Sequence, residues 1–164
     1  MQARDLMTAD VETVHEDEEV SEVLRKLARR DFTGFPVVDD ADRLVGVVTQ
    51  RDMVELFQPK DRTIWIPIGL PPFLESLEYG FDLSWDELES ELDLARHAGK
   101  PIRKIMTTDV LTVEPDASMD DVLAILASDD RDVNRVPVVE GETLVGLVTR
   151  EDVLRALHAE RSGA

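Results

Sequence analysis

The sequence predicts an α+β fold in which two pseudo-symmetric units, each a small sheet covered by helices, pack as one module. Three observations predict it. A set of short motifs occurs twice in the same order. Each copy combines β-branched runs with an amphipathic helical stretch. Each copy is also only about 55 residues long, a size that is marginal alone, so the two copies should share a core.

The duplication is visible in three motifs that recur along the chain. Each copy has a Met-Thr opening, a Pro-Val-Val run and a closing Leu-Val-Gly-hydrophobic-Val-Thr-x-x-Asp; the openings are at 6–8 and 105–107, the Pro-Val-Val runs at 36–38 and 137–139, and the closing motifs at 44–52 and 144–152. The offset between copies stays between 99 and 101 residues. An internal duplication of this kind predicts two similar units with sites at the seam between them.

In the first copy the order is strand, helix, strand, strand, helix. We expect a short strand at Val11 to Val14, after which the acidic residues 16–19 suit a helix N-terminus. Apolar residues at i, i+3, i+4, i+7 and i+8 then form one helical face: Val20, Val23, Leu24, Leu27 and Ala28, with the helix ending at 29–31. Strands follow at 36–38 and 44–48, separated by the polar turn 39–42. The last helix starts at Thr49 and carries Met53, Val54 and Phe57.

The second copy repeats this order. Its first helical face consists of Met119, Val122, Leu123, Leu126 and Ala127. Strands are expected at 136–139 and 144–148, and the last helix presents Val153, Leu154 and Leu157. We therefore assign residues 1–58 to unit one and 101–160 to unit two.

Residues 59–100 belong to neither copy. They contain an apolar stretch at 62–74, and a capping-box signature at Ser84 with Glu87 precedes an amphipathic helix predicted at about 85–98. A segment this apolar must pack on something and is no flexible tether. Two interpretations stay open: it covers the edge of the module's own core, or it forms a dimer contact or docking surface for a regulated partner.

The composition limits the classes of function. Asp and Glu number 36 against 18 Lys and Arg, a formal net charge of −18. That charge argues against nucleic-acid binding, and it disfavours anionic ligands unless basic groups lie close to the site. With no cysteine, there is neither a disulfide framework nor a Cys-ligated metal site. Without a membrane-length apolar run or a signal-peptide pattern, we expect a cytoplasmic protein that does not enter a membrane.

The order of these elements and motifs resembles the CBS domain, named for cystathionine β-synthase. The motifs that carry the resemblance are the Met-Thr opening, the Pro-Val-Val strand and the closing Gly-x-x-Thr-x-x-Asp, and it covers about residues 1–58 and 101–160. The resemblance implies a stand-alone pair of CBS domains folded as one module. Many such pairs bind adenosine-containing ligands between the two units, act as regulatory sensors and not as enzymes, and associate as dimers.

The chemistry of the Thr-x-x-Asp motif agrees with that implication. A hydroxyl with free backbone N–H groups suits a phosphate, and a carboxylate suits the two hydroxyls of a ribose. The same pattern is close to a capping box, which only satisfies the donors of a helix end. The two interpretations are compatible, because a cap can also face a cleft.

Carried onto this sequence, the resemblance implies two ligand sites. The preferred site combines Thr149, Asp152 and Arg135 with Phe32 and Thr33, walled by residues 6–11. The second and weaker site combines Thr49, Asp52, Val133 and Asn134, walled by residues 105–110.

Arg135 distinguishes the two sites. It stands two residues before Pro137, where the resemblance places a phosphate contact, whereas its counterpart two residues before Pro36 is Gly34. Arginine binds phosphate with charge-assisted, geometrically specific hydrogen bonds. The alternative for Arg135 is a surface arginine paired with Asp130 or Asp132.

These observations lead to a functional expectation. The chain is expected to be a non-enzymatic, homodimeric sensor that binds AMP, ADP, ATP or S-adenosylmethionine, and to require no cofactor and no metal. The alternative is a ligand-independent dimerisation or partner-docking module that acts through residues 59–100.

Overall fold

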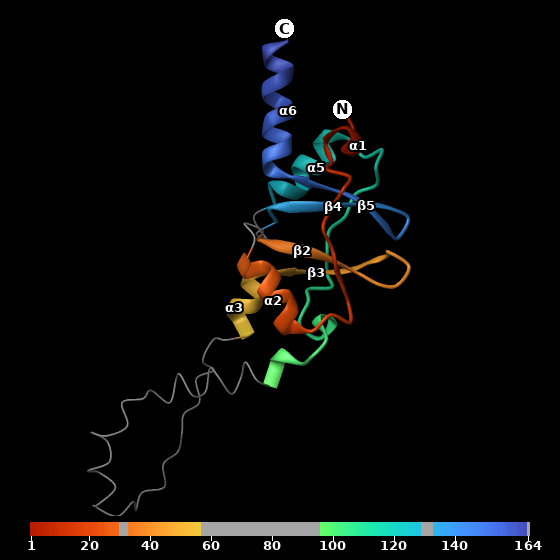
Figure 1. The fold of residues 1–164 in the computed structure, drawn as a ribbon. Coiled ribbons are helices and arrows are strands. Elements are labelled where there is room, and N and C mark those ends of the chain that lie inside the picture. Colours follow the sequence, from red (N-terminus) through yellow and green to blue (C-terminus); the bar gives the residue numbers. More distant parts are fainter. Residues whose placement is uncertain (30–32, 57–95, 129–132, 164) are drawn as a thin grey trace, which may run out of the picture.

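The computed structural model describes residues 1–29, 33–56, 96–128 and 133–163. These residues form two small α+β units, which confirms the predicted fold class (Figure 1). Unit one consists of β1 (Val14–His15), α2 (Val20–Arg29), β2 (Gly34–Val38), β3 (Leu44–Thr49) and α3 (Gln50–Leu56). Unit two consists of α5 (Met119–Leu126), β4 (Arg135–Glu140), β5 (Thr143–Thr149) and α6 (Arg150–Ser162).

Each unit is built on one antiparallel hairpin. β2 pairs with β3, and β4 pairs with β5 in the equivalent register, so that Gly34 faces Thr49 and Arg135 faces Thr149. β1 adds a third, parallel strand to the first sheet. In unit two the matching contact is a single parallel bridge between Val113 and Val138.

The opening segments cross over to the opposite unit. α1 (Ala3–Leu6) contacts α6 and β5 of unit two, and its Ala3 and Leu6 are buried in the core of that unit (Figure 1). The short 3-10 helix η2 (Ile102–Lys104) is placed reciprocally, with Ile102 fully buried in the core of unit one. Thr8 pairs with Leu147, and Thr107 pairs with Val47. Each core is thus completed by the opening segment of the other unit.

This crossover gives the recurring motifs a steric reason. A Cβ atom placed on Gly46 would lie 2.8 Å from both Met106 Sδ and Thr107 O. On Gly146 it would overlap the side chain of Met7. The closing Gly of one unit therefore makes room for the Met-Thr opening of the other, which explains why the two motifs occur together.

Several predicted elements differ from the structure. The strand expected at Val11 to Val14 is shorter in the structure and spans Val14–His15. Thr8 is paired with Leu147 of unit two, so the residues that follow it lead the chain from unit two back to unit one. The helices α1 and η2 were not predicted, since four and three residues are too short to show a helical period.

The helical faces were predicted one residue too wide. Val54 and Leu154, assigned to buried faces, are 61% and 66% exposed. Ala28 and Ala127, at the ends of the other two faces, are exposed as well. A periodicity fixes the centre of an apolar face better than its edges, and all four residues lie at an edge.

Part of the predicted insert is described. Residues 96–98 are helical and the helix has ended at Gly99, as the Gly99-Lys100-Pro101 signal predicts. The other residues of the helix predicted at about 85–98, the apolar stretch 62–74 and Phe57 lie outside the described residues. Among the helices that the structure describes, none is long and apolar enough to cross a membrane.

Candidate functional site

Both closing motifs place their threonine between a strand and a helix. The Thr49 N–H and hydroxyl donate to Asp52 Oδ2 at 2.7 and 3.0 Å, and the Asp52 N–H donates to Thr49 Oγ1 at 3.3 Å. In the Thr149 and Asp152 pair the same three distances are 2.9, 2.7 and 3.2 Å. Both pairs therefore form capping boxes, and in each the cap uses Oδ2 of the aspartate and leaves Oδ1 for another contact.

The second carboxylate oxygen differs between the units. Asp52 Oδ1 accepts a hydrogen bond from the Thr107 hydroxyl at 3.2 Å, across the seam between the units. Asp152 Oδ1 instead lies 3.4 Å from Arg155 Nη1, one turn along its own helix. The two caps are equivalent in their backbone role, but only the first joins the two units through a side chain.

A cavity of about 700 Å³ opens at the seam, beside the first of these caps. Its volume lies in the range of about 300–1,000 Å³ that is usual for small-molecule pockets. Both units contribute to its wall; the lining residues are Thr33, Gly34, Phe35, Pro36, Val47, Val48, Thr49, Gln50, Arg51, Thr107, Asp109, Val110, Leu111, Val133, Asn134, Arg135, Pro137 and Leu147.

The cavity brings together residues from both predicted sites. Thr49, Val133 and Asn134 from the second predicted site line it, and so do Thr33 and Arg135 from the preferred one. Asp52 does not line the cavity but is bonded to Thr107, which does. Thr149 and Asp152 lie outside this lining, and Phe32 is outside the described residues. The sequence-based grouping into two sites stays a prediction.

Several lining residues were not among the predicted site residues. Gln50 and Arg51 directly follow Thr49, and Leu111 directly follows the predicted wall 105–110, so their positions in the sequence were a usable signal. Pro36 and Pro137 open the recurring Pro-Val-Val motifs but were not assigned to a site, and Leu147 carries no such signal. They reach the cavity because the two hairpins face each other, which is a property of the packing and not of either copy alone.

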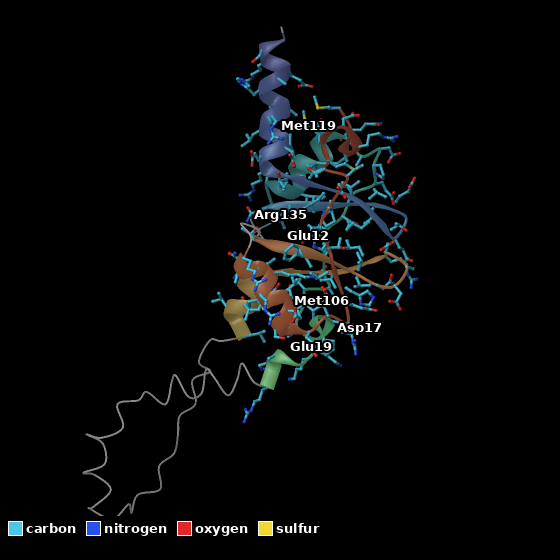
Figure 2. All side chains as sticks on the ribbon, in the orientation of Figure 1. Glu12, Asp17, Glu19, Met106, Met119 and Arg135 are labelled. Atoms are coloured by element: carbon cyan, nitrogen blue, oxygen red, sulfur yellow. The ribbon has the colours of Figure 1, made fainter. Side chains whose placement is uncertain are left out.

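Arg135 is a basic residue that crosses the seam between the units. It begins β4 and is half-buried, and its Nη1 donates to the backbone carbonyl of Gly34 at 3.1 Å (Figure 2). Burial lowers the pKa of the Arg135 guanidinium, because water is removed from the charged group. The predicted alternative, a surface pairing with Asp130 or Asp132, involves partners outside the described residues.

The charges around the cavity differ from those of the whole chain. Among the described lining residues, the charged ones are Arg51, Arg135 and Asp109, with Asp52 hydrogen-bonded to the lining residue Thr107, whereas the chain carries a formal net charge of −18. At physiological salt, charges are screened over about 8 Å, so these local groups dominate what a ligand experiences. The described part of the site can therefore accommodate a ligand with an anionic group, an apolar body and hydroxyls.

Two mutually completed repeats with a ligand-sized cavity at their seam define a paired-repeat module. The chain belongs to the CBS domain family: the family model for the CBS domain matches residues 3–58 and 102–159. These ranges coincide with the two units and their crossed opening segments. The predicted resemblance to a CBS pair is confirmed.

The chain is similar to archaeal and plant CBS proteins. The uncharacterized protein MJ1426 of Methanocaldococcus jannaschii is 27% identical over 158 residues, which are 96% of this chain and 91% of the relative. The chloroplastic CBS domain-containing protein CBSX1 of Arabidopsis thaliana is 31% identical over 157 residues, 94% of this chain and 62% of the relative.

Solved structures of CBSX2, another Arabidopsis thaliana protein, have the same fold. A crystal structure of CBSX2 superimposes with a TM-score of 0.72 and 26% identity, covering 99% of this chain and 98% of CBSX2. A structure of CBSX2 in complex with AMP has a TM-score of 0.68 at 24% identity and covers 98% of each chain.

Proposed function

We propose that this protein is a regulatory module that binds an adenosine-containing ligand, AMP, ADP, ATP or S-adenosylmethionine, in the cavity at the seam. The observation that carries the proposal is the lining of that cavity by both units, with the guanidinium of Arg135 at one part of the wall and the Thr49 cap at another. The AMP complex of CBSX2, a protein with the same fold, supports the choice of ligand class.

Each part of such a ligand has a counterpart in the site. Arg135 binds the phosphate, because its planar fork of donors matches phosphate oxygens. The Thr107 hydroxyl, which lines the cavity, is hydrogen-bonded to the Asp52 carboxylate at 3.2 Å, and we assign the ribose hydroxyls to this pair. The apolar side chains of Val110, Leu111 and Pro137 form a wall for the base.

The proposed role is regulation through binding. CBS-pair proteins are generally regulatory modules. Ligand contacts on both units would make the strength of their association depend on occupancy, which is what a sensor requires. No catalytic step and no required cofactor belongs to this proposal.

Isothermal calorimetry with the four ligands tests the proposal. We expect at least one of them to bind the full chain, and we expect Val110→Trp, which fills the cavity, to abolish that binding. The matched control is Val11→Trp, at the equivalent position of unit one and outside the cavity lining. If no ligand binds the unmodified protein, the proposal fails. If only Val11→Trp abolishes binding, the ligand occupies the other predicted site, the one that contains Thr149 and Asp152.

Self-association is a second candidate function. Val54 and Leu154 occupy equivalent positions of α3 and α6 and are 61% and 66% exposed, so they are the apolar side chains that these two helices offer to a second copy of the chain. We expect the double variant Val54→Asp, Leu154→Asp to be monomeric by light scattering if these helices form the interface. The predicted docking role of residues 59–100 is tested by deleting 64–74: an unchanged oligomeric mass and partner profile would count against it.

A further inference from the structure

The two units are joined at one end of their hairpins. The hairpin turns meet there: Leu44 N–H donates to Glu142 O at 2.9 Å, Leu144 N–H donates to Asp42 O at 3.2 Å, and Arg43 bridges to Thr143. Figure 1 shows both hairpins pointing the same way, with these turns side by side. Backbone hydrogen bonds across the seam make this end a fixed joint.

The opposite end of the hairpins holds Arg135 and the cavity. Gly34 and Arg135 begin β2 and β4, so they lie a full strand away from the joined turns. Figure 2 shows Arg135 at this end, where β4 faces β2. Its side chain crosses the seam to reach the carbonyl of Gly34, its own counterpart in the duplication, at 3.1 Å. Both residues line the cavity.

Only one of the two equivalent positions can carry this side chain. A Cβ atom on Gly34 would lie 2.7 Å from the backbone carbonyl of Val48, closer than real Cβ contacts occur. The glycine therefore keeps its carbonyl at the seam, where the arginine of the other unit reaches it. The guanidinium of Arg135 in unit two therefore contacts unit one, and unit one has no equivalent side chain at Gly34.

We propose that Arg135 is a clasp between the two units, and that a phosphate-bearing ligand releases it by drawing the guanidinium from the Gly34 carbonyl onto its phosphate. The inference rests on the proposed function for its ligand and on the geometry alone for the clasp. An arginine–phosphate contact is stronger than an arginine–carbonyl contact, because both partners are charged. This exchange removes the hydrogen bond between Arg135 and Gly34, which crosses the seam at the end of the hairpins opposite the joined turns.

The clasp makes the signal depend on the phosphate. AMP would move Arg135 and loosen the seam at the cavity end, whereas adenosine would occupy the cavity and leave the clasp closed. Arg135 is thus a specificity-determining residue whose position also reports which kind of ligand is bound.

Distances between spin labels on the two units test the clasp. The chain has no cysteine, so Glu55→Cys in α3 and Glu160→Cys in α6, both exposed, carry the only labels. Dilution with unlabelled protein restricts the reading to intramolecular distances. We expect AMP to shift or broaden the distance distribution, adenosine to leave it unchanged, and Arg135→Met to broaden it without ligand.

The control variant is Arg150→Met. Arg150 Nη2 also donates to a backbone carbonyl, that of Leu126 at 3.1 Å, but within unit two and outside the cavity. We expect it to leave the distance distribution as in the unmodified protein. Calorimetry should show AMP affinity falling about ten- to a hundredfold in Arg135→Met, as for loss of a charged hydrogen bond, with adenosine affinity unchanged.

The outcomes separate the clasp from the proposed function. If AMP binds but neither AMP nor Arg135→Met changes the distance distribution, the clasp is wrong and the ligand site stands. If AMP does not bind, the proposed function fails, and the ligand-free comparison of Arg135→Met with Arg150→Met still decides whether Arg135 holds the units together.

Discussion

The two units share a backbone plan but differ in the side chains that face the seam. Asp52 contacts Thr107 across the seam, whereas Asp152 contacts Arg155 on its own helix. Leu111 lines the cavity, while the equivalent residue of the first copy is the acidic Glu12, which is not in the lining. The two units therefore have similar backbones, but a few differences in side chains give the Thr49 side an apolar wall beside Arg135. The comparison predicts that equivalent substitutions in the two units have unequal effects.

The largest difference between equivalent substitutions is expected in the cores, and it concerns the free energy of unfolding. Phe35 and Val136 are equivalent residues of β2 and β4, and both are buried at 1% and 0% exposure. Phe35→Ala should lower the free energy of unfolding by about 3–5 kcal/mol through the cavity it leaves. Val136→Ala removes fewer atoms and should cost about 2 kcal/mol. Urea denaturation measures both, and equal losses would show that unit one relaxes around the missing ring.

The crossing points of the opening segments should also respond unequally. An added Cβ at Gly46 meets the Thr107 carbonyl at 2.8 Å, which is backbone and cannot turn aside. At Gly146 the nearest atoms all belong to the side chain of Met7. Gly46→Ala should therefore cost about 2–3 kcal/mol of stability by overpacking, and Gly146→Ala about 1 kcal/mol. Thermal denaturation of the two variants compares them directly; the reverse order would mean that the Met7 side chain is the less adaptable neighbour.

Substituting the aspartates of the two capping boxes distinguishes an effect on stability from an effect on ligand binding. Both aspartates stand at the N3 position and accept hydrogen bonds from the N–H and hydroxyl of the N-cap threonine; an asparagine there keeps one side-chain oxygen as acceptor, so Asp52→Asn and Asp152→Asn should each change stability by less than about 1 kcal/mol. Asp52→Asn should weaken binding of AMP about tenfold, because an acceptor for the ribose hydroxyls is lost beside the cavity. Asp152→Asn should leave the affinity unchanged. A stronger effect of Asp152→Asn in calorimetry would instead favour the sequence-based grouping of Arg135 with Thr149 and Asp152.

Much of the fold could be predicted because the repeat constrains each element twice. The helical faces around Val23 and Val122, the Pro-Val-Val strands and the capped Thr-x-x-Asp turns each follow from local patterns that recur at a nearly constant offset. The crossover could not be predicted in this way. Which core Ala3 and Leu6 complete depends on long-range packing, to which a short segment of four residues gives no clue.

The same limit applies to the candidate site. The sequence identified Thr49, Asn134 and Arg135 as candidates because each stands at a fixed place in a motif. It could not predict that Arg135 shares a cavity with Thr49, since that depends on how the two hairpins face each other. The contact from Arg135 to the Gly34 carbonyl is likewise invisible in a sequence, because its acceptor is a backbone atom.

The smallest inequality concerns pH, and it is confined to unit one. A hydrogen bond from the exposed His15 to Asp40, 2.7 Å between Nε2 and Oδ1, raises the pKa of the imidazole; the equivalent residue in the second copy is Glu114. Because the folded pKa lies above the unfolded one, the stabilisation is fully present below the unfolded value near 6.5 and is lost as the pH rises through the folded pKa.

Proton NMR of the imidazole should show the pKa of His15 falling in Asp40→Asn and staying raised in Asp42→Asn. Asp42 lies in the same turn and has a φ of 59°, which asparagine tolerates. An unchanged pKa in Asp40→Asn would assign the shift to the neighbouring acidic residues 16–17 instead. The effect on melting temperature should be slight, since the pair is exposed and screened by solvent.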